Sequence, residues 1–568
     1  MNPTKTSGYA LALLLSLAAG PLLEAEVKMP AIFGDYMVLQ QEAVLPVWGT
    51  AEAGEKVTVA VGAESASATA DANGRWTVKL PPLPNGAPPV TMTVAGKNTR
   101  LTFTDVLVGD VWVCSGQSNM EYPLSGAHNT AVELPKSNDP ELRLFHVQRA
   151  TSLQPNPDVV GSWRLCAPDT AKGFTAVGYF FGRELRTSLN RPIGLIEAAW
   201  SGTEAQAWTS LGGLKKEPSL HGYVDKYTLN AANYPKALAD LPAQNAAFQV
   251  AHDAWYRDVN PALQVALKDW KDAVDKAKAA GQPPPPRPQP SKPFPSPPPD
   301  PTGGPHGPSN LFNGMIAPLI PYAIKGAIWY QGESNASQAM EYRTLFPLMI
   351  SDWRRHWALG DFPFLFVQLA SYDESVHPAQ DWALLRESQM KTLALPNTGM
   401  ASAVDIGDPA AIHPQDKMDV GLRLAFAAKH IAYGQNLVFS GPIYDSMKVE
   451  GNSIRVSFTQ TGGGLVVGRA PWIPASMKKN PVSATDLESF TIAGADHNWV
   501  PAQAKIDGAA VVVSSREITQ PVAVRYGWCD APRCNLYNKE GLPASPFRTD
   551  DWPQSSPDAK AAPKPVAH

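Results

Sequence analysis

The chain contains little cysteine and no excess of basic residues. Its 568 residues include 4 cysteines, too few for a disulfide framework in a chain of this length. No cysteine has the Cys/His spacing of a zinc site, so we expect neither a metal nor another cofactor. The 48 Lys and Arg residues against 52 Asp and Glu residues give a net charge of -4, which provides no basic surface for binding nucleic acid.

Long hydrophobic runs are also missing beyond residue 25, so we expect no stable insertion into a membrane. Residues 1–25 carry Lys5, an apolar run over 9–19, and then small residues at Gly20 and Ala25. This order is typical of a signal peptide whose apolar part is too short to anchor a protein. The sequence therefore predicts a secreted or periplasmic protein, and it leaves the oligomeric state open.

The four cysteines divide into two kinds. In an oxidising compartment, Cys529 and Cys534 are close enough in sequence to form a disulfide that closes a small loop. Cys114 and Cys166 lie in apolar surroundings, where thiols are commonly buried as small hydrophobic groups. We therefore expect one disulfide and two reduced thiols in the exported protein.

Three regions differ in their hydrophobic pattern. Residues 26–108 and 438–552 alternate apolar and polar residues between turn signals, which predicts β-sandwich-like domains at the two ends. Residues 109–437 contain near-continuous apolar strands separated by helical stretches, which predicts an α/β domain with a parallel sheet covered on both faces. The Pro/Ala/Lys-rich residues 553–568 are expected to form a disordered tail.

The α/β pattern is interrupted at about 213–308. A helical stretch over 246–280 precedes a proline run at 283–301, where much of the chain's total of 55 prolines lies. This composition predicts an extended, solvated spacer on the surface, with no catalytic role. The apolar segments that we expect to form strands around this insert are Ile193–Ala199, Gly326–Tyr330, Phe364–Leu369 and Met400–Asp405.

Two distant segments each place a serine beside an asparagine on a glycine turn. These are Gly116–Met120, with Ser118, and Gly332–Asn335, with Ser334. Before the first segment, residues 111–114 read as a short buried strand, so Ser118 is expected at a strand-to-helix turn, where a nucleophile can face solvent. The alternative is that either serine only caps a helix, a role that needs no chemistry.

A hydroxyl nucleophile needs a base, and His413 is the best candidate. It follows a predicted strand and precedes Pro414, which suits the first turn of a helix, while Gly434 suits the helix end. His413 is therefore expected at a helix entrance and not inside an apolar helix face.

Four blocks of the sequence together resemble the sialate O-acetylesterase family of the SGNH hydrolase superfamily. The resemblance implies a flavodoxin-like SGNH hydrolase domain flanked by β domains, and an esterase that removes O-acetyl groups from sugars. It extends over about residues 28–550 except for the proline-rich insert. The blocks are Gly116–Met120, Trp200–Thr203, Tyr330–Asn335 and Ile412–Pro414.

The resemblance also implies the roles of individual residues. Ser118 corresponds to the nucleophile, and its backbone N–H group, together with Gly202 and Asn335, corresponds to the oxyanion hole. His413 corresponds to the general base that later protonates the departing sugar oxygen. Ser334 belongs to the block that supplies an oxyanion donor, so its hydroxyl is expected to hold that loop in place.

One position departs from the family pattern. SGNH hydrolases commonly carry an aspartate three residues before the histidine, where this chain has Ala410, and position 411 is also alanine. Asp408 is the nearest upstream carboxylate and completes a triad if the loop from Gly407 folds back. Otherwise a backbone carbonyl orients the ring of His413 and the site is a Ser–His dyad.

Six further residues are candidates for contact with the sugar. An arginine suits the carboxylate of a sialic acid, whereas a neutral polysaccharide such as acetylated xylan needs no such contact. Packing in the core or a position on a solvated helix face would equally explain the tryptophan and the arginine of the set. The candidates are Gln117, Gln331, Glu333, Trp208, Arg386 and Gln389.

Other readings of the chain are open at this point. The β domains would also suit a carbohydrate-binding protein without catalysis, although the joint presence of Ser118, Gly202, Asn335 and His413 argues against it. A lipase-like α/β-hydrolase would need a G-x-S-x-G motif, which surrounds neither Ser118 nor Ser334. The sequence does not distinguish sialic acid, xylan and pectin as the acetylated substrate.

Overall fold

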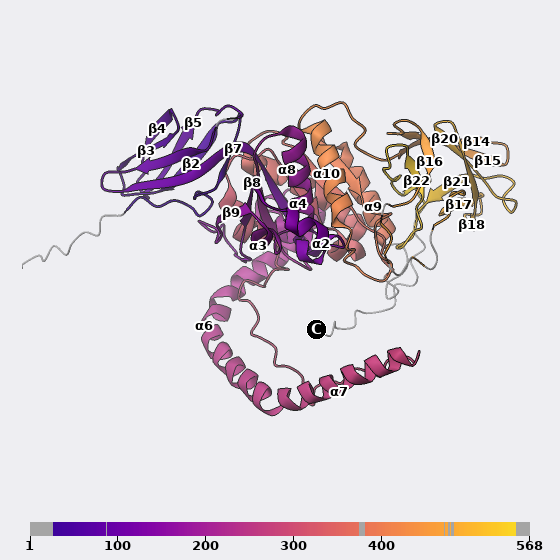
Figure 1. The fold of residues 1–568 in the computed structure, drawn as a ribbon, viewed down its shortest axis with the longest axis horizontal. Coiled ribbons are helices and arrows are strands. Elements are labelled where there is room, and N and C mark those ends of the chain that lie inside the picture. The colour runs from indigo at the N-terminus through magenta and orange to yellow at the C-terminus, as the bar shows by residue number, and fades with distance from the viewer. Residues whose placement is uncertain are drawn as a thin grey trace, which may run out of the picture.

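Three folded regions lie in a row, and a long helical arm projects from the middle one (Figure 1). The computed structural model describes residues 26–86, 88–373, 381–470, 472–474, 478 and 482–552. The predicted signal peptide at 1–25 and the predicted tail at 553–568 lie outside the described residues. Within the described part, no helix is both long and apolar enough to cross a membrane.

The middle region is built on a sheet with the strand order β13-β12-β11-β7-β10-β8-β9. All neighbouring strands are parallel except β9, which runs antiparallel to β8 at the edge. The six parallel strands alternate with helices along the chain, which confirms the predicted α/β fold class. The strands are β7 (Arg100–Gly116), β8 (Asp139–His146), β9 (Trp163–Cys166), β10 (Ile193–Ala199), β11 (Gly326–Tyr330), β12 (Phe364–Gln368) and β13 (Thr398–Ser402).

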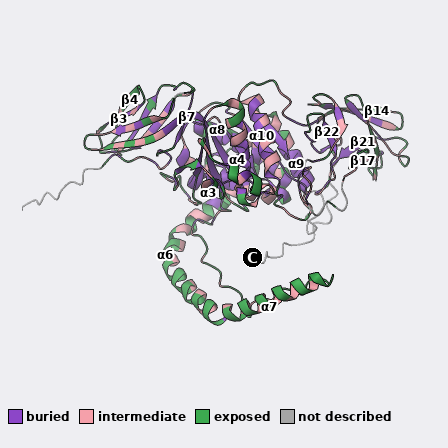
Figure 2. Ribbon diagram, in the orientation of Figure 1, coloured by how far each residue is buried: buried purple, intermediate pink, exposed green. Residues whose placement is uncertain are grey.

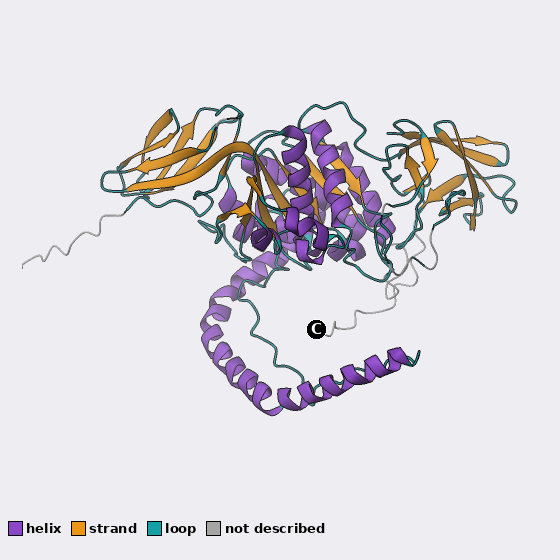
Figure 3. Ribbon diagram, in the orientation of Figure 1, coloured by secondary structure: helices purple, strands orange, loops and turns teal. Residues whose placement is uncertain are grey.

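Helices cover both faces of this sheet (Figure 3). Trp329 of β11 packs against Trp353 of α8 with 5.9 Å between ring centroids. The next residue, Tyr330, has its ring centroid 5.4 Å from Lys417 Nζ at the start of α10. Because successive side chains of a strand point to opposite faces, α8 and α10 lie on opposite sides of the sheet.

The longer helices are separated by short helical turns near the site. Some of these turns contain only four residues and mainly redirect the chain. The helices of the middle region are α1 (Ser118–Glu121), α2 (Thr130–Glu133), α3 (Pro168–Ala171), α4 (Ala176–Leu189), α5 (Leu211–Leu214), α8 (Ala339–Trp357), α9 (Asp381–Lys391) and α10 (Lys417–Ile431).

The N-terminal β region shares a strand with the middle region. The 17 residues of β7 pair with β6 over their first part and with β10 and β11 over their last part. The boundary predicted at residue 109 therefore falls inside a continuous strand. The other strands are β1 (Val38–Gln40), β2 (Leu45–Thr50), β3 (Lys56–Val61), β4 (Glu64–Thr69), β5 (Arg75–Leu80) and β6 (Val90–Ala95).

The arm consists of α6 (His221–Asp258), α7 (Asn260–Ala279) and the proline-rich segment that returns to the sheet domain. Both helices are largely exposed (Figure 2). The proline-rich segment runs back along them, with Trp270 Nε1 donating to the Pro285 carbonyl at 2.8 Å and Trp255 Nε1 to the Lys292 carbonyl at 2.9 Å. Because α6 begins at His221, the helical part of the insert is longer than the predicted 246–280.

The C-terminal region contains a second apolar core between two four-stranded antiparallel sheets. Phe547 lies in this core, with ring centroids 4.9 Å from Tyr444 and 5.6 Å from Phe458. The strand orders are β14-β15-β20-β19 and β18-β17-β21-β23. The bounds are β14 (Ile443–Glu450), β15 (Ser453–Thr459), β16 (Leu465–Val467), β17 (Phe490–Ala493), β18 (Trp499–Pro501), β19 (Gln503–Asp507), β20 (Ala510–Ser514), β21 (Ala523–Tyr526), β22 (Leu536–Asn538) and β23 (Phe547–Arg548).

The state of the cysteines differs from the predicted disulfide. All four are free thiols, so the expected disulfide between Cys529 and Cys534 is not formed. Cys529 is exposed, whereas Cys534 is buried, and burial raises the pKa of the Cys534 thiol to about 12. A neutral, buried thiol is a poor nucleophile for disulfide formation. Cys114 and Cys166 are buried thiols, as the sequence predicts.

Candidate active site

The carboxyl ends of three neighbouring strands meet at one edge of the sheet. The register pairs Gly116, the last residue of β7, with Ala199 at the end of β10 and with Tyr330 at the end of β11. The predicted blocks that contain Ser118, Gly202 and Asn335 follow directly after these three strand ends. Parallel sheets commonly hold their sites at this edge.

Ser118 begins α1 two residues after β7 ends. The intervening turn requires glycine at position 116, because a Cβ there would lie 2.1 Å from the Tyr330 carbonyl oxygen. The φ of Gly116 is +135°, a value that side chains disfavour. The structure thus shows the strand-to-helix turn expected for Ser118, whose residue is half-buried.

Ser118 and His413 line the same open cleft, of about 370 Å³. They lie almost three hundred residues apart in sequence, and the sheet edge brings them together. No hydrogen bond joins His413 to any residue in the described part of the chain. The other residues that line the cleft are Glu121, Tyr122, Pro123, His146, Arg149, Gly173, Glu197 and Ser201.

Asn119 connects the serine block to the histidine block. Its Nδ2 donates to the Ile412 carbonyl at 3.0 Å and to Glu333 Oε1 at 2.6 Å, and its Oδ1 accepts from Lys417 Nζ at 2.5 Å. One amide side chain therefore fixes the residue before His413, the loop after β11 and the start of α10. The sequence gives no sign of this role beyond the fact that Asn119 directly follows the predicted nucleophile.

Lys417 is a fully buried lysine beneath the cleft. Its Nζ lies 4.8 Å from the centroid of the Tyr122 ring. Burial lowers the pKa of Lys417 to about 7, although the nearby Glu333 and Asp416 oppose this shift. Burial, followed by the charge of Lys417, lowers the pKa of His413 from its ordinary value of 6.5. The environment thus favours a neutral imidazole, the form that acts as a base.

The two carboxylates that most closely precede His413 in the sequence bond to other groups. Asp408 Oδ1 accepts from the Ala410 backbone N–H at 2.9 Å, and Asp405 is bound by Arg423 at 2.6 Å and by Tyr537 at 2.8 Å. A carboxylate bonded to the imidazole would raise the pKa of His413, whereas that pKa is lowered. The role of Asp408 as triad acid stays a prediction. The contacts of Asp408 and Asp405 leave His413 without a carboxylate partner among the described residues, as expected for a Ser–His dyad.

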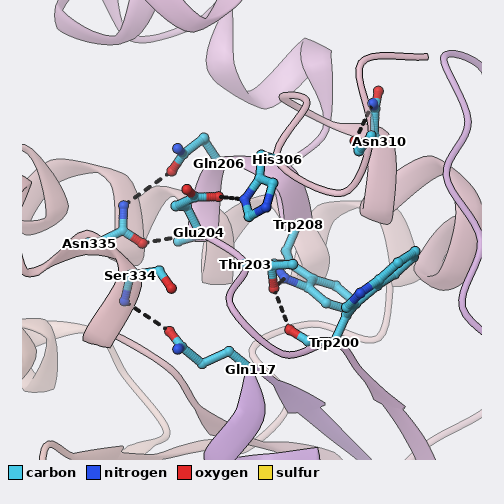
Figure 4. A network of polar contacts seen from close by, with 12 residues as sticks. Gln117, Trp200, Thr203, Glu204, Gln206, Trp208, His306, Asn310, Ser334 and Asn335 are labelled. Atoms are coloured by element: carbon cyan, nitrogen blue, oxygen red, sulfur yellow. Dashed lines mark hydrogen bonds and ion pairs between the residues drawn. The ribbon is translucent and has the colours of Figure 1, made fainter. Parts of the chain in front are cut away.

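The two residues expected to join Ser118 in the oxyanion hole lie in different surroundings. Gly202 is exposed, with φ +75° and open space around it. Asn335 is fully buried, and its Nδ2 donates to Gln206 Oε1 at 3.1 Å (Figure 4). Its Oδ1 accepts from the Ala205 N–H at 2.9 Å and from Gln331 Nε2 at 2.6 Å. Asn335 therefore connects loops below the cleft.

Three of the predicted sugar contacts are buried glutamines that join loops. Gln117 Oε1 accepts from the Ser334 N–H at 3.2 Å (Figure 4). Gln331 Oε1 accepts from Tyr342 at 3.0 Å, and Gln389 Nε2 donates to the Gln331 carbonyl at 3.1 Å. None of the three lines the cleft, so their positions correct the prediction of sugar contact.

Arg386 and Trp208 are fully buried as well. The Arg386 guanidinium donates to four backbone carbonyls, of Leu369, Ala370, Cys529 and Asp530, at 2.7 to 2.8 Å. A guanidinium satisfied in this way is not available to a substrate carboxylate, so this prediction is also corrected. Arg386 instead connects the sheet domain to the C-terminal region.

Trp208 lies in the apolar core beside Trp329, with 6.1 Å between ring centroids, and its Nε1 donates to Thr203 at 2.9 Å. This corrects the prediction that it touches the sugar. Glu333, the sixth predicted contact, bonds to Asn119, and burial raises the pKa of its carboxyl. Neither side chain lines the cleft.

The charged side chains that do line the cleft were missed from the sequence. Glu121 Oε1 accepts from Arg149 Nε at 2.8 Å, and its Oε2 accepts from the Ser201 N–H at 2.8 Å. The Arg149 guanidinium lies 5.4 Å from the centroid of the Trp200 ring. Glu121 lies three residues after Ser118 on α1, so helical spacing was the available signal. These contacts hold the Trp200–Thr203 block against α1.

Comparisons with known proteins show which family the chain resembles. A sequence profile described as carbohydrate esterase, sialic acid-specific acetylesterase, matches residues 108–234 and 309–432. Mouse sialate O-acetylesterase is 30% identical over 565 residues, which cover 92% of this chain and 94% of the mouse protein. The chain belongs to the sialate O-acetylesterase family. This confirms the family that the motifs predicted.

Other relatives support membership of the sialate O-acetylesterase family. The human sialate O-acetylesterase is 29% identical over 95% of this chain. A solved carbohydrate acetylesterase from Xanthomonas citri is 35% identical, with a TM-score of 0.72, and the match covers 93% of this chain and 100% of that one. The family profile leaves out residues 235–308, which form most of the arm.

Proposed function

We propose that the protein is a carbohydrate O-acetylesterase that removes acetyl groups from sugar hydroxyls through a serine acyl-enzyme. The observation that carries this proposal is the placement of Ser118 and His413 on one solvent-open cleft. Membership of the sialate O-acetylesterase family supports the same reaction.

In the proposed reaction, neutral His413 removes the proton from Ser118 Oγ as this oxygen attacks the acetyl carbonyl. The tetrahedral intermediate collapses, and His413 gives the proton to the departing sugar oxygen. Water, deprotonated by His413, then attacks the acetyl-enzyme, releasing acetate and restoring Ser118.

The developing oxyanion needs donors near Ser118. The backbone N–H groups of Ser118 and Gly202 have no acceptor among the described residues, and the two residues closely follow the ends of β7 and β10. We assign the oxyanion hole to these two groups, with Asn335 as a positioning residue below them.

We also propose that the protein is exported, because residues 1–25 have the pattern of a signal peptide. N-terminal sequencing of the mature protein from the producing cell tests this proposal. A chain that retains residues 1–25 inside the cytoplasm would contradict it.

Acetate release tests the proposed function. The purified protein should release acetate from an acetylated glycan, measured across O-acetylated sialic acid, acetylated xylan and acetylated pectin, and the Ser118→Ala variant should release none. A protein that binds such glycans but releases no acetate would instead be a carbohydrate-binding protein.

A further inference from the structure

A second groove, of about 470 Å³, lies directly beside the catalytic cleft. His146 and Gly173 line both, so the two are continuous. The groove extends away from Ser118 along the edge of the sheet, where β8 and β9 pair with Phe145 opposite Trp163.

The groove has an apolar floor and a polar rim. Leu144 and Phe174 are buried beneath it, while exposed polar side chains surround it, among them Gln148, Arg164 and Asp169. Ligand sites combine apolar surface with a few placed polar groups in this way. Hydroxyl groups of a sugar are both donors and acceptors, and the rim offers amide, guanidinium and carboxylate partners for them.

His146 stands where the cleft and the groove join, and it is fixed in place. Its Nδ1 lies 3.1 Å from Glu197 Oε2, and the Glu197 side chain is 1% exposed on β10. The hydrogen bond that the Glu197 carboxylate accepts from the imidazole raises the pKa of His146. Its Nε2 has no partner in the described part of the chain and remains available to a ligand, since the side chain is 53% exposed.

We propose that this groove binds the sugar next to the acetylated one, so that the substrate is an acetylated oligosaccharide or polysaccharide and not a free acetylated monosaccharide. This inference rests on the proposed esterase function. Each cavity exceeds the roughly 300 Å³ at which ligand sites begin. With the acetyl group at Ser118 and its sugar in the cleft, the groove lies beyond that sugar and has room for a neighbour.

Two matched pairs of probes test the proposal. The first pair is O-acetylated N-acetylneuraminic acid and the same acetylated sugar within sialyllactose, and the second is acetylated xylose and acetylated xylotriose. At least one of the two pairs should be deacetylated. For that pair, we expect kcat/KM for acetate release to be at least about tenfold higher for the longer probe, a difference of about 1.4 kcal/mol. 4-Nitrophenyl acetate reports on the esterase chemistry without a sugar.

Two variants alter the groove without changing the catalytic pair. Arg164→Ala removes a rim contact, and Ser162→Trp fills the groove. The matched controls are Arg516→Ala and Ser65→Trp, which change exposed residues of the two β regions. We expect both groove variants to lower the ratio of kcat/KM for the longer probe to that for 4-nitrophenyl acetate by about tenfold, equivalent to 1.4 kcal/mol, and both controls to keep it.

These measurements distinguish a wrong subsite from a wrong esterase function. Equal kcat/KM values for the short and long probes, or a wild-type ratio in both groove variants, would overturn the subsite while leaving the sugar esterase function intact. Turnover of 4-nitrophenyl acetate without acetate release from any of the four sugar probes would overturn the proposed function and the subsite together.

Discussion

At the scale of residues, the site depends on buried polar side chains that do not touch the cleft. Asn119, Glu333 and Lys417 form one connected group beneath Ser118 and His413. A buried lysine is costly because its charge loses hydration, and here Asn119 and the rings of Tyr122 and Tyr330 partly compensate for that loss. The group places the positive charge of Lys417 near His413.

We predict that Lys417→Met shifts the acid limb of the pH profile of kcat/KM to higher pH. Lys417 is charged below its pKa of about 7, and this charge disfavours the imidazolium form of His413. Without the charge, the pKa of His413 rises, and activity with 4-nitrophenyl acetate falls at acidic pH. Lys417→Arg, which keeps the charge, is the control, and an unshifted limb in Lys417→Met would contradict the prediction.

The second residue-scale prediction concerns Asp408. Loss of a triad aspartate costs about 10⁴ in kcat. We expect Asp408→Asn to cost far less, because the structure shows no hydrogen bond between the imidazole of His413 and Asp408. The measurement is kcat across pH 6 to 9. The Ser118→Ala variant, which lacks the proposed nucleophile, gives the rate expected when the catalytic reaction is lost. A loss that approaches the triad value would show that Asp408 orients His413 during the reaction.

At the scale of elements, the loops after β7, β10 and β11 form a single interlocked unit. Asn335 bonds to the loop after β10, while Gln117 bonds to the loop after β11. Each loop therefore holds the next in position at the carboxyl edge of the sheet.

We predict that Asn335→Ala mainly destabilises the fold. The change leaves buried partners on Ala205, Gln206 and Gln331 unsatisfied, and each such group costs about 1–3 kcal/mol. The free energy of unfolding in urea should fall, with Ser334→Ala as the neighbouring control. Unchanged stability with a fall in kcat of about 10²- to 10³-fold would instead identify Asn335 as an oxyanion donor.

The arm is the other element with a testable role. The side chain of Asn230 lies against Gly303, so the two ends of the arm are adjacent. A variant can therefore be made in which a short linker replaces residues 233–299. We expect this deletion to preserve the melting temperature and the turnover of 4-nitrophenyl acetate, because the removed residues are largely exposed. Loss of turnover at unchanged stability would show that the arm contributes to the site.

At the scale of the whole molecule, the sequence predicted backbone features better than side-chain roles. The expected strands Ile193–Ala199 and Gly326–Tyr330 match β10 and β11 residue for residue, because runs of apolar residues between turn signals depend on local pattern. The predicted boundary at 109 was not observed, since β7 continues through it by pairing in two sheets.

The roles of polar side chains could not be predicted because they depend on tertiary packing. Arg386 reads as a solvated helix residue, yet the C-terminal region supplies two of its four carbonyl partners. Lys417 lies at the start of a helix, yet segments that are distant in the sequence bury it. The sequence could predict that Ser118 and His413 lie at one cleft, because their motifs follow strand ends and parallel strands bring their ends together.

The central claim is that Ser118 is the residue acylated during ester hydrolysis. Labelling with diisopropyl fluorophosphate, followed by peptide mass spectrometry and an assay of acetate release, tests it most directly. We expect one adduct, on Ser118, with complete loss of acetate release, and no adduct in the Ser118→Ala variant. An adduct on Ser334, or acetate release by Ser118→Ala at the wild-type rate, would contradict it.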